Sequence, residues 1–224
     1  LTYGGVSLSL GANTLTIAGA GTLLNTNALV LGDPSSVLKL SGANTISGPV
    51  SLNSGTIDVD ESSTLSSDLT MGGSATIDVA QEKTLTYGGA SLEVGANILT
   101  LRGGGIWNSV NALKLNQTGG LVELDGINEV NAPLELTGGA LKAAESSVLS
   151  GVLSLSGPST VEVALQKKLS YQAGGLELGT HSLEIKGEGE LEFTVPQAAL
   201  VLDETSSLLL LSGSGRIPRV LISA

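Results

Sequence analysis

The chain repeats itself at an interval of 84 residues, and this repeat constrains the fold more than any other feature. The sequence LTYGGVSLSLG begins at Leu1, LTYGGASLEVG begins at Leu85 and LSYQAGGLELG begins at Leu169. The first two copies align along their whole length without a gap. Such a repeat predicts a stack of equivalent units, each packed on its neighbours. We therefore expect one repeat domain over residues 1–224, with units 1–84 and 85–168 and a partial unit 169–224.

A shorter period of about 21 residues runs inside each unit. Triplets in which two apolar residues flank an outward-facing one recur along the chain, as strands with one buried face would require. In the first unit these triplets are 8–10, 29–31, 50–52 and 69–71. A second, aliphatic column has the same mean period. It predicts that four residues lie side by side on successive coils: Leu38, Ile57, Ile77 and Leu99.

These columns, with a third and shorter one through Leu65 and Leu85, describe three strands per coil. Gly and Asn, which tolerate positive φ, follow many of the strands and suit sharp corners. The coils vary between about 19 and 26 residues and lack a six-residue period, which argues against a hexapeptide solenoid. The sequence predicts a right-handed parallel β-helix (β-solenoid) of about ten coils. At roughly 4.8 Å per coil, its length is on the order of 50 Å.

Composition supports an aliphatic core and excludes several partners. The 224 residues include three Tyr, one Trp, one Phe, one Met and no Cys, but 31 Gly. Identical stacked layers can be filled by aliphatic side chains alone. The net charge of −11 disfavours binding to nucleic acid or to an anionic membrane surface. No apolar run approaches the roughly 18 residues of a membrane span. Because the chain starts inside a repeat, we expect it to be a piece of a longer protein.

Charged residues are predicted to form ladders along the sheet faces. One ladder contains Glu93, Lys114 and Glu135, and another contains Glu123, Lys142 and Glu162. In a solenoid, equivalent residues of successive coils are neighbours, so opposite charges alternate in both ladders. We expect them to maintain solubility and register.

Acidic residues on neighbouring coils raise the question of catalysis or cation binding. Asp58 and Asp78 are the pair to consider for acid–base hydrolysis, and Asp58, Asp60 and Glu61 for a calcium ion. A flat face offers no cleft to perturb these carboxylates, and no Arg or Lys of the kind that polysaccharide lyases use is placed beside Asp58 and Asp78. We therefore expect no catalytic residue, no metal site and no cofactor.

Two further residue types have structural interpretations. His181 is the only histidine, stands where other coils have a corner Asn and has no catalytic or metal-binding partner nearby in the sequence. Tyr3, Tyr87 and Tyr171 share one position of the long repeat, and we expect them to pack against their own coils rather than to line a ligand site.

A few residues depart from the outward-polar rule and mark a candidate interaction surface. They are Val30, Val201, Leu210 and Pro196, the last in an insertion that displaces the final coil. Exposed apolar side chains of this kind favour contact with a further coil or a neighbouring molecule.

The chain resembles the β-helical repeat regions of large bacterial surface and secreted proteins, such as autotransporter passengers and filamentous-haemagglutinin-like adhesins. The resemblance is carried by stacked coils, Gly and Asn corners and segments such as LELTGGAL at 134–141. It implies a location outside the cell or on the bacterial cell surface, and a non-catalytic role as a structural shaft or adhesive stalk. Neighbouring coils of a longer chain would be its first partners. Self-association, binding of a surface glycan or protein, and polysaccharide lyase or hydrolase activity remain as alternatives.

Overall fold

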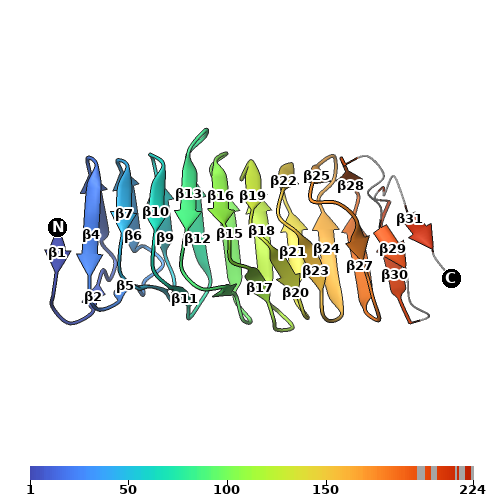
Figure 1. Cartoon of the computed structure of the whole chain (residues 1–224), viewed down its shortest axis with the longest axis horizontal. Coiled ribbons are helices and arrows are strands. Elements are labelled where there is room, and N and C mark those ends of the chain that lie inside the picture. The colour runs from blue at the N-terminus through green and yellow to red at the C-terminus, as the bar shows by residue number, and fades with distance from the viewer. Residues whose placement is uncertain (196–199, 203–205, 215, 217–219, 223–224) are drawn as a thin grey trace.

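The computed structural model is an all-β parallel solenoid that makes about nine turns. It describes residues 1–195, 200–202, 206–214, 216 and 220–222. Successive coils follow one another along the long axis of the molecule, from the N-terminus to the C-terminus (Figure 1). Each coil contributes strands to three faces, which are called face A, face B and face C in chain order. The predicted parallel β-solenoid is therefore confirmed.

Faces A and C are continuous ten-stranded sheets. Face A stacks β1 (Thr2–Tyr3), β4 (Gly21–Asn25), β7 (Asn44–Ile46), β10 (Ser63–Leu65), β13 (Thr84–Tyr87), β16 (Ile106–Ser109), β19 (Glu129–Asn131), β22 (Ser147–Leu149), β25 (Lys168–Tyr171) and β28 (Glu190–Phe193). Face C stacks β3 (Thr14–Ala18), β6 (Val37–Ser41), β9 (Thr56–Val59), β12 (Ala75–Val79), β15 (Ile98–Arg102), β18 (Leu121–Asp125), β21 (Ala140–Ala143), β24 (Ser159–Val163), β27 (Ser182–Gly187) and β30 (Leu208–Ser212).

Face B is divided into three shorter sheets. The first contains β2 (Leu8–Ser9), β5 (Leu29–Leu31), β8 (Val50–Leu52) and β11 (Leu69–Met71); the second contains β14 (Leu92–Glu93), β17 (Leu113–Leu115), β20 (Leu134–Leu136) and β23 (Leu153–Leu155); the third contains β26 (Leu176–Glu177), β29 (Leu200–Leu202) and β31 (Val220–Ile222). The two breaks, between β11 and β14 and between β23 and β26, fall once per 84-residue unit.

The core is the aliphatic interior that the alternation predicts. Buried Leu, Ile, Val and Ala side chains of all three faces form one cluster that extends through most of the described coils. Each strand has one side in the core and one side facing solvent. Apolar inward residues and polar outward residues therefore alternate along it. In β9, for example, Ile57 and Val59 are fully buried, whereas Thr56 and Asp58 are half-buried on the outer surface.

The predicted second column holds inside a unit and fails between units. Leu38 pairs with Ile57, and Ile57 pairs with Ile77, as expected. At the next coil, however, Ile77 pairs with Leu101, and Leu99 pairs with Ala75. The prediction that Ile77 and Leu99 are direct neighbours is therefore wrong by two residues.

This register step recurs on both continuous faces. On face A, Leu65 pairs with Tyr87 rather than with Leu85, and Leu149 pairs with Tyr171 rather than with Leu169. On face C, Val161 pairs with Ile185 rather than with Leu183. A shift of two residues keeps every side chain on its own face, so the core remains apolar in spite of the step.

A buried tyrosine lies at each step and closes the break in face B. Inside a unit, the first N–H of a face B strand donates to a backbone carbonyl of the next coil, as Val50 does to Asp68 at 3.0 Å. At the breaks, the N–H of Leu69 donates to the Tyr87 hydroxyl and the N–H of Leu153 donates to the Tyr171 hydroxyl, both at 3.0 Å. Each tyrosine thus replaces a backbone acceptor.

The tyrosine rings are part of the core. The relative exposures of Tyr87 and Tyr171 are 2% and 1%. Tyr87 stacks on Trp107 with ring centroids 5.6 Å apart, and Tyr171 meets Phe193 edge-on at 5.7 Å. Burial raises the pKa of both phenols, an effect that the hydrogen bonds from Leu69 and Leu153 partly offset. The packing interpretation of these two tyrosines is confirmed, although each contacts neighbouring coils as well as its own.

Candidate functional site

The residues predicted to form an interaction surface do not come together in one patch. Val30 lies on β5 and Val201 on β29, half-buried near opposite ends of face B. Leu210 lies on β30 of face C and is 48% exposed. Pro196 lies outside the described residues. Val30, Val201 and Leu210 thus occupy different regions of the surface.

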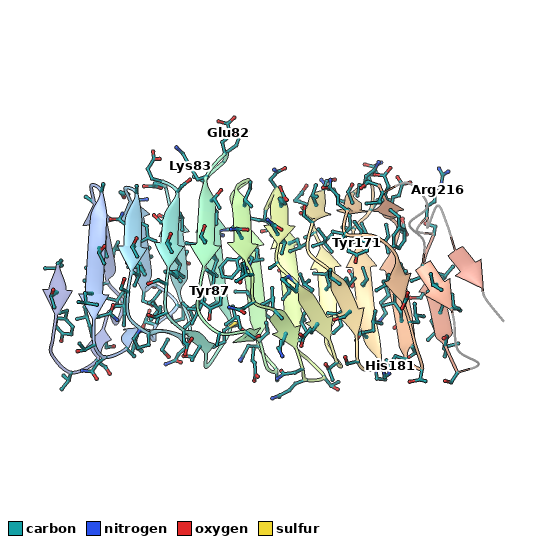
Figure 2. All side chains as sticks on the ribbon, viewed as in Figure 1. Glu82, Lys83, Tyr87, Tyr171, His181 and Arg216 are labelled. Carbon is teal, nitrogen blue, oxygen red and sulfur yellow. The ribbon has the colours of Figure 1, made fainter. Side chains whose placement is uncertain are left out.

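His181 lies in a turn at the corner between β26 and β27. Its backbone N–H donates to the Leu178 carbonyl at 3.1 Å, and its carbonyl accepts from the Leu208 N–H at 3.3 Å. Figure 2 shows it at the edge of the solenoid, far along the axis from Tyr87. The backbone of His181 joins successive coils, as the structural interpretation expects.

Asp58 and Asp78 are register partners on neighbouring coils, as predicted. Each carboxylate forms an ion pair with a basic side chain. Lys39 Nζ is 2.7 Å from Asp58 Oδ2, and Arg102 Nε is 2.8 Å from Asp78 Oδ2. The register step explains the second pair, since it places Arg102 opposite Asp78. Both carboxylates are thus engaged by cations.

Lys39 also binds a second carboxylate. Its Nζ lies 2.8 Å from Asp60 Oδ2, and the hydrogen bonds to Asp58 and Asp60 raise the pKa of Lys39. The hydrogen bond from Lys39 lowers the pKa of Asp60 in turn. Glu61 pairs with Lys83 at 2.7 Å. Among the described residues, no group of three or more His, Cys, Asp or Glu side chains is arranged to hold a metal ion.

The predicted charge ladders are present in register. Glu93, Lys114 and Glu135 are successive partners on face B, and Lys114 Nζ lies 2.9 Å from Glu135 Oε2. On face C, Lys142 lies between Glu123 and Glu162, with Nζ 2.8 Å from Glu123 Oε1. The hydrogen bond with Glu123 raises the pKa of Lys142. These half-exposed pairs are each worth under about 1 kcal/mol.

Two grooves on face C were not predicted from the sequence. The first groove has a volume of about 370 Å³, and its lining includes Pro34, Ser54, Thr56, Thr76, Thr100 and Glu123. The second groove has a volume of about 550 Å³, and its lining includes Thr118, Gly138, Ala140, Thr160, Glu184 and Leu210. Both are open to solvent along the start of the face C strands.

The two grooves are the same structural feature in consecutive units. Pro34 and Thr118, Ser54 and Gly138, and Thr76 and Thr160 are repeat counterparts, each pair separated by 84 positions. Each groove spans a register step, because the first includes β12 and β15 and the second includes β24 and β27. Alignment of the repeats alone conceals this, since it pairs Asp78 with Thr100 and Glu162 with Glu184. Charge complementarity was the available signal: the stepped register pairs Asp78 with Arg102 and Glu162 with Lys186.

Comparison with protein-family models, with curated proteins and with solved structures gave no significant match. None of the described residues belongs to a helix of the length and apolar character that crossing a membrane requires. The fold and the surface geometry are therefore the basis for a functional proposal.

Proposed function

We propose that this chain is a segment of a structural shaft in a large bacterial surface or secreted protein, where it holds other parts of that protein at a distance from the cell. The observation that carries the proposal is the repeated unit boundary. Tyr87 and Tyr171 close their breaks in face B with the same hydrogen bond and the same 3.0 Å distance. A unit of 84 residues can therefore be added or removed without creating a new kind of interface, which suits a part whose length matters.

The surface chemistry supports a non-catalytic role for the shaft. The most suggestive carboxylate pair, Asp58 and Asp78, is engaged by Lys39 and Arg102, whereas acid–base hydrolysis requires one carboxyl group with a raised pKa and one free carboxylate. The ion-pair ladders on faces B and C keep the outward surface polar. These features are typical of a solvated rod.

Deletion of residues 85–168 tests the modular shaft. The shortened protein should keep the β-sheet circular dichroism of the parent and shorten by four coils, about 19 Å at the usual strand spacing. Small-angle scattering measures the longest dimension. A control deletion of 85–158 removes three coils and part of a fourth and should misfold, because the strands on either side of the junction no longer fall on matching faces. If deletion of 85–168 also misfolds, the units are not interchangeable and the proposal loses its basis.

A further inference from the structure

The two grooves of face C follow one another along the rod, and together they are called the trough. The first groove extends to Glu123 and the second begins beside Leu121, so both border strand β18. Together they cross the face from Thr56 on β9 to Leu210 on β30. Eight strands at the usual spacing give the two grooves a combined extent of about 34 Å along the rod axis, and the register step displaces the second groove sideways by two residues. The trough therefore has the shape to receive a linear polymer.

The floor of the first groove presents a row of hydroxyl groups. Thr56 pairs with Thr76, and Thr76 pairs with Thr100, so the three side chains lie on consecutive coils. All three are half-buried, and within the described part of the chain their hydroxyls have no hydrogen-bond partner. Thr160 holds the corresponding position in the second groove and also has a hydroxyl without a partner there. These groups are available to a ligand as both donors and acceptors.

The charges and hydrogen-bonding groups that line the trough favour some classes of linear polymer over others. Glu123, Glu162 and Glu184 line it, whereas Lys142 is its one lining cation among the described residues and is held by Glu123. Acidic polymers would be repelled. An extended peptide lying along the trough would lack backbone partners, because the floor strands from β9 to β27 are already paired on both sides. A chain of uncharged sugars brings hydroxyls that donate and accept, which matches threonine hydroxyls and carboxylates.

We propose that the trough binds a linear, uncharged polysaccharide, with one binding segment in each 84-residue unit. This goes beyond the shaft function, which does not require a ligand. The lining of both grooves lacks an aromatic platform, so each segment binds weakly. A polymer that spans both grooves gains affinity because its second contact is intramolecular.

The test uses uncharged β-1,3-glucan, β-1,4-glucan and α-1,4-glucan oligomers of three to eight sugars, with oligogalacturonate as the anionic counterpart. Titration is followed by NMR or calorimetry on the full chain. At least one uncharged series should bind, with Kd falling at least about tenfold between three and eight sugars as the ligand reaches the second groove. Oligogalacturonate should not bind. Absence of binding by every uncharged series, equal binding of the anionic chain, or preferential binding of a lysine-rich peptide would each overturn the proposal.

Two substitutions place the ligand on face C. Thr76→Val and Thr160→Val each remove one groove hydroxyl at constant shape and should each weaken binding of the octasaccharide about 3- to 10-fold. Thr64→Val, on the outer surface of β10 in face A, is the matched control and should leave Kd unchanged. If both groove variants bind as tightly as the parent, the ligand does not lie in the trough. The shaft proposal is judged separately, from the scattering of the unit deletion.

Discussion

Coil contacts inside a unit and contacts between units achieve the same stacking by different means. The coil that contains β8 and the coil that contains β11 pair on all three faces without a register shift. On face B, the N–H of Val50 donates to a backbone carbonyl of the next coil. Between β11 and β14, faces A and C advance by two residues, face B loses its pairing and a tyrosine hydroxyl receives the N–H of Leu69. The comparison shows that a solenoid can tolerate a discontinuity when one buried side chain supplies both the missing acceptor and the missing volume.

The largest effect should come from removing that side chain. Tyr87→Ala leaves a cavity beside Trp107 and an unpaired N–H at Leu69, and should lower the free energy of unfolding by about 3–5 kcal/mol. Denaturant titration followed by tryptophan fluorescence measures it. Tyr3→Ala is the control, since Tyr3 shares the repeat position but is only half-buried. Similar losses for Tyr3 and Tyr87 would show that the boundary has no special dependence on its tyrosine.

Removing only the hydroxyl separates hydrogen bonding from packing. Tyr87→Phe keeps the ring but leaves the buried N–H of Leu69 without an acceptor, at a cost of about 1–3 kcal/mol. Hydrogen exchange of the Leu69 amide should accelerate accordingly. Tyr3→Phe should have almost no effect, because no described residue hydrogen-bonds to that hydroxyl. An unchanged exchange rate in Tyr87→Phe would mean that another group closes the break.

Alkaline pH should weaken the unit boundaries in particular. Because the folded pKa of Tyr87 and Tyr171 is raised, their contribution is fully present below the unfolded pKa of about 10 and is lost as pH rises towards the folded value. The loss is at most about 1.4 kcal/mol per tyrosine for each pH unit above 10. Thermal unfolding between pH 8 and 11.5 measures it. The double variant Tyr87→Phe/Tyr171→Phe should lose less stability over this range; an equal loss would assign the effect to lysine deprotonation.

The smallest effect should come from the ladders inside a unit. Lys114→Met removes the half-exposed ion pair with Glu135, and should change the free energy of unfolding by less than about 1 kcal/mol. The difference between variant and parent should shrink further in 1 M salt, because screening weakens the pair in the parent. A loss comparable to that of Tyr87→Phe would reverse the ranking of the two kinds of contact.

The sequence was sufficient to predict the coils but not the step between units. Alternation places Leu38, Ile57 and Ile77 inside, and a period of about 21 residues brings them together. A displacement of two residues leaves that alternation intact, so Ile77 meets an apolar partner whether it faces Leu99 or Leu101. Hydrophobic pattern is therefore insensitive to the step. Only charge pairing, such as Asp78 with Arg102, distinguishes the two registers.

The grooves escaped prediction for the same reason. The sequence columns place Thr56 and Thr76 side by side on adjacent coils. At the unit boundary, however, the same columns pair Thr100 with Asp78 instead of Thr76. The actual row of three hydroxyls exists only in the stepped register. The break in face B was hidden as well, because Leu69 and Leu92 carry the same strand pattern as the paired triplets.

The register step also displaces equivalent surface residues of consecutive units sideways, so that they follow a helical path around the rod. Thr14 stacks through Val37, Thr56 and Thr76 onto Thr100, although its repeat counterpart is Ile98. Each unit is thus offset sideways by two residues, about 7 Å, for about 19 Å of axial advance. Identical surface groups in consecutive units consequently follow an oblique line inclined by roughly 20° to the axis. A straight partner lying parallel to the axis therefore contacts a different outward-facing column of residues in each unit.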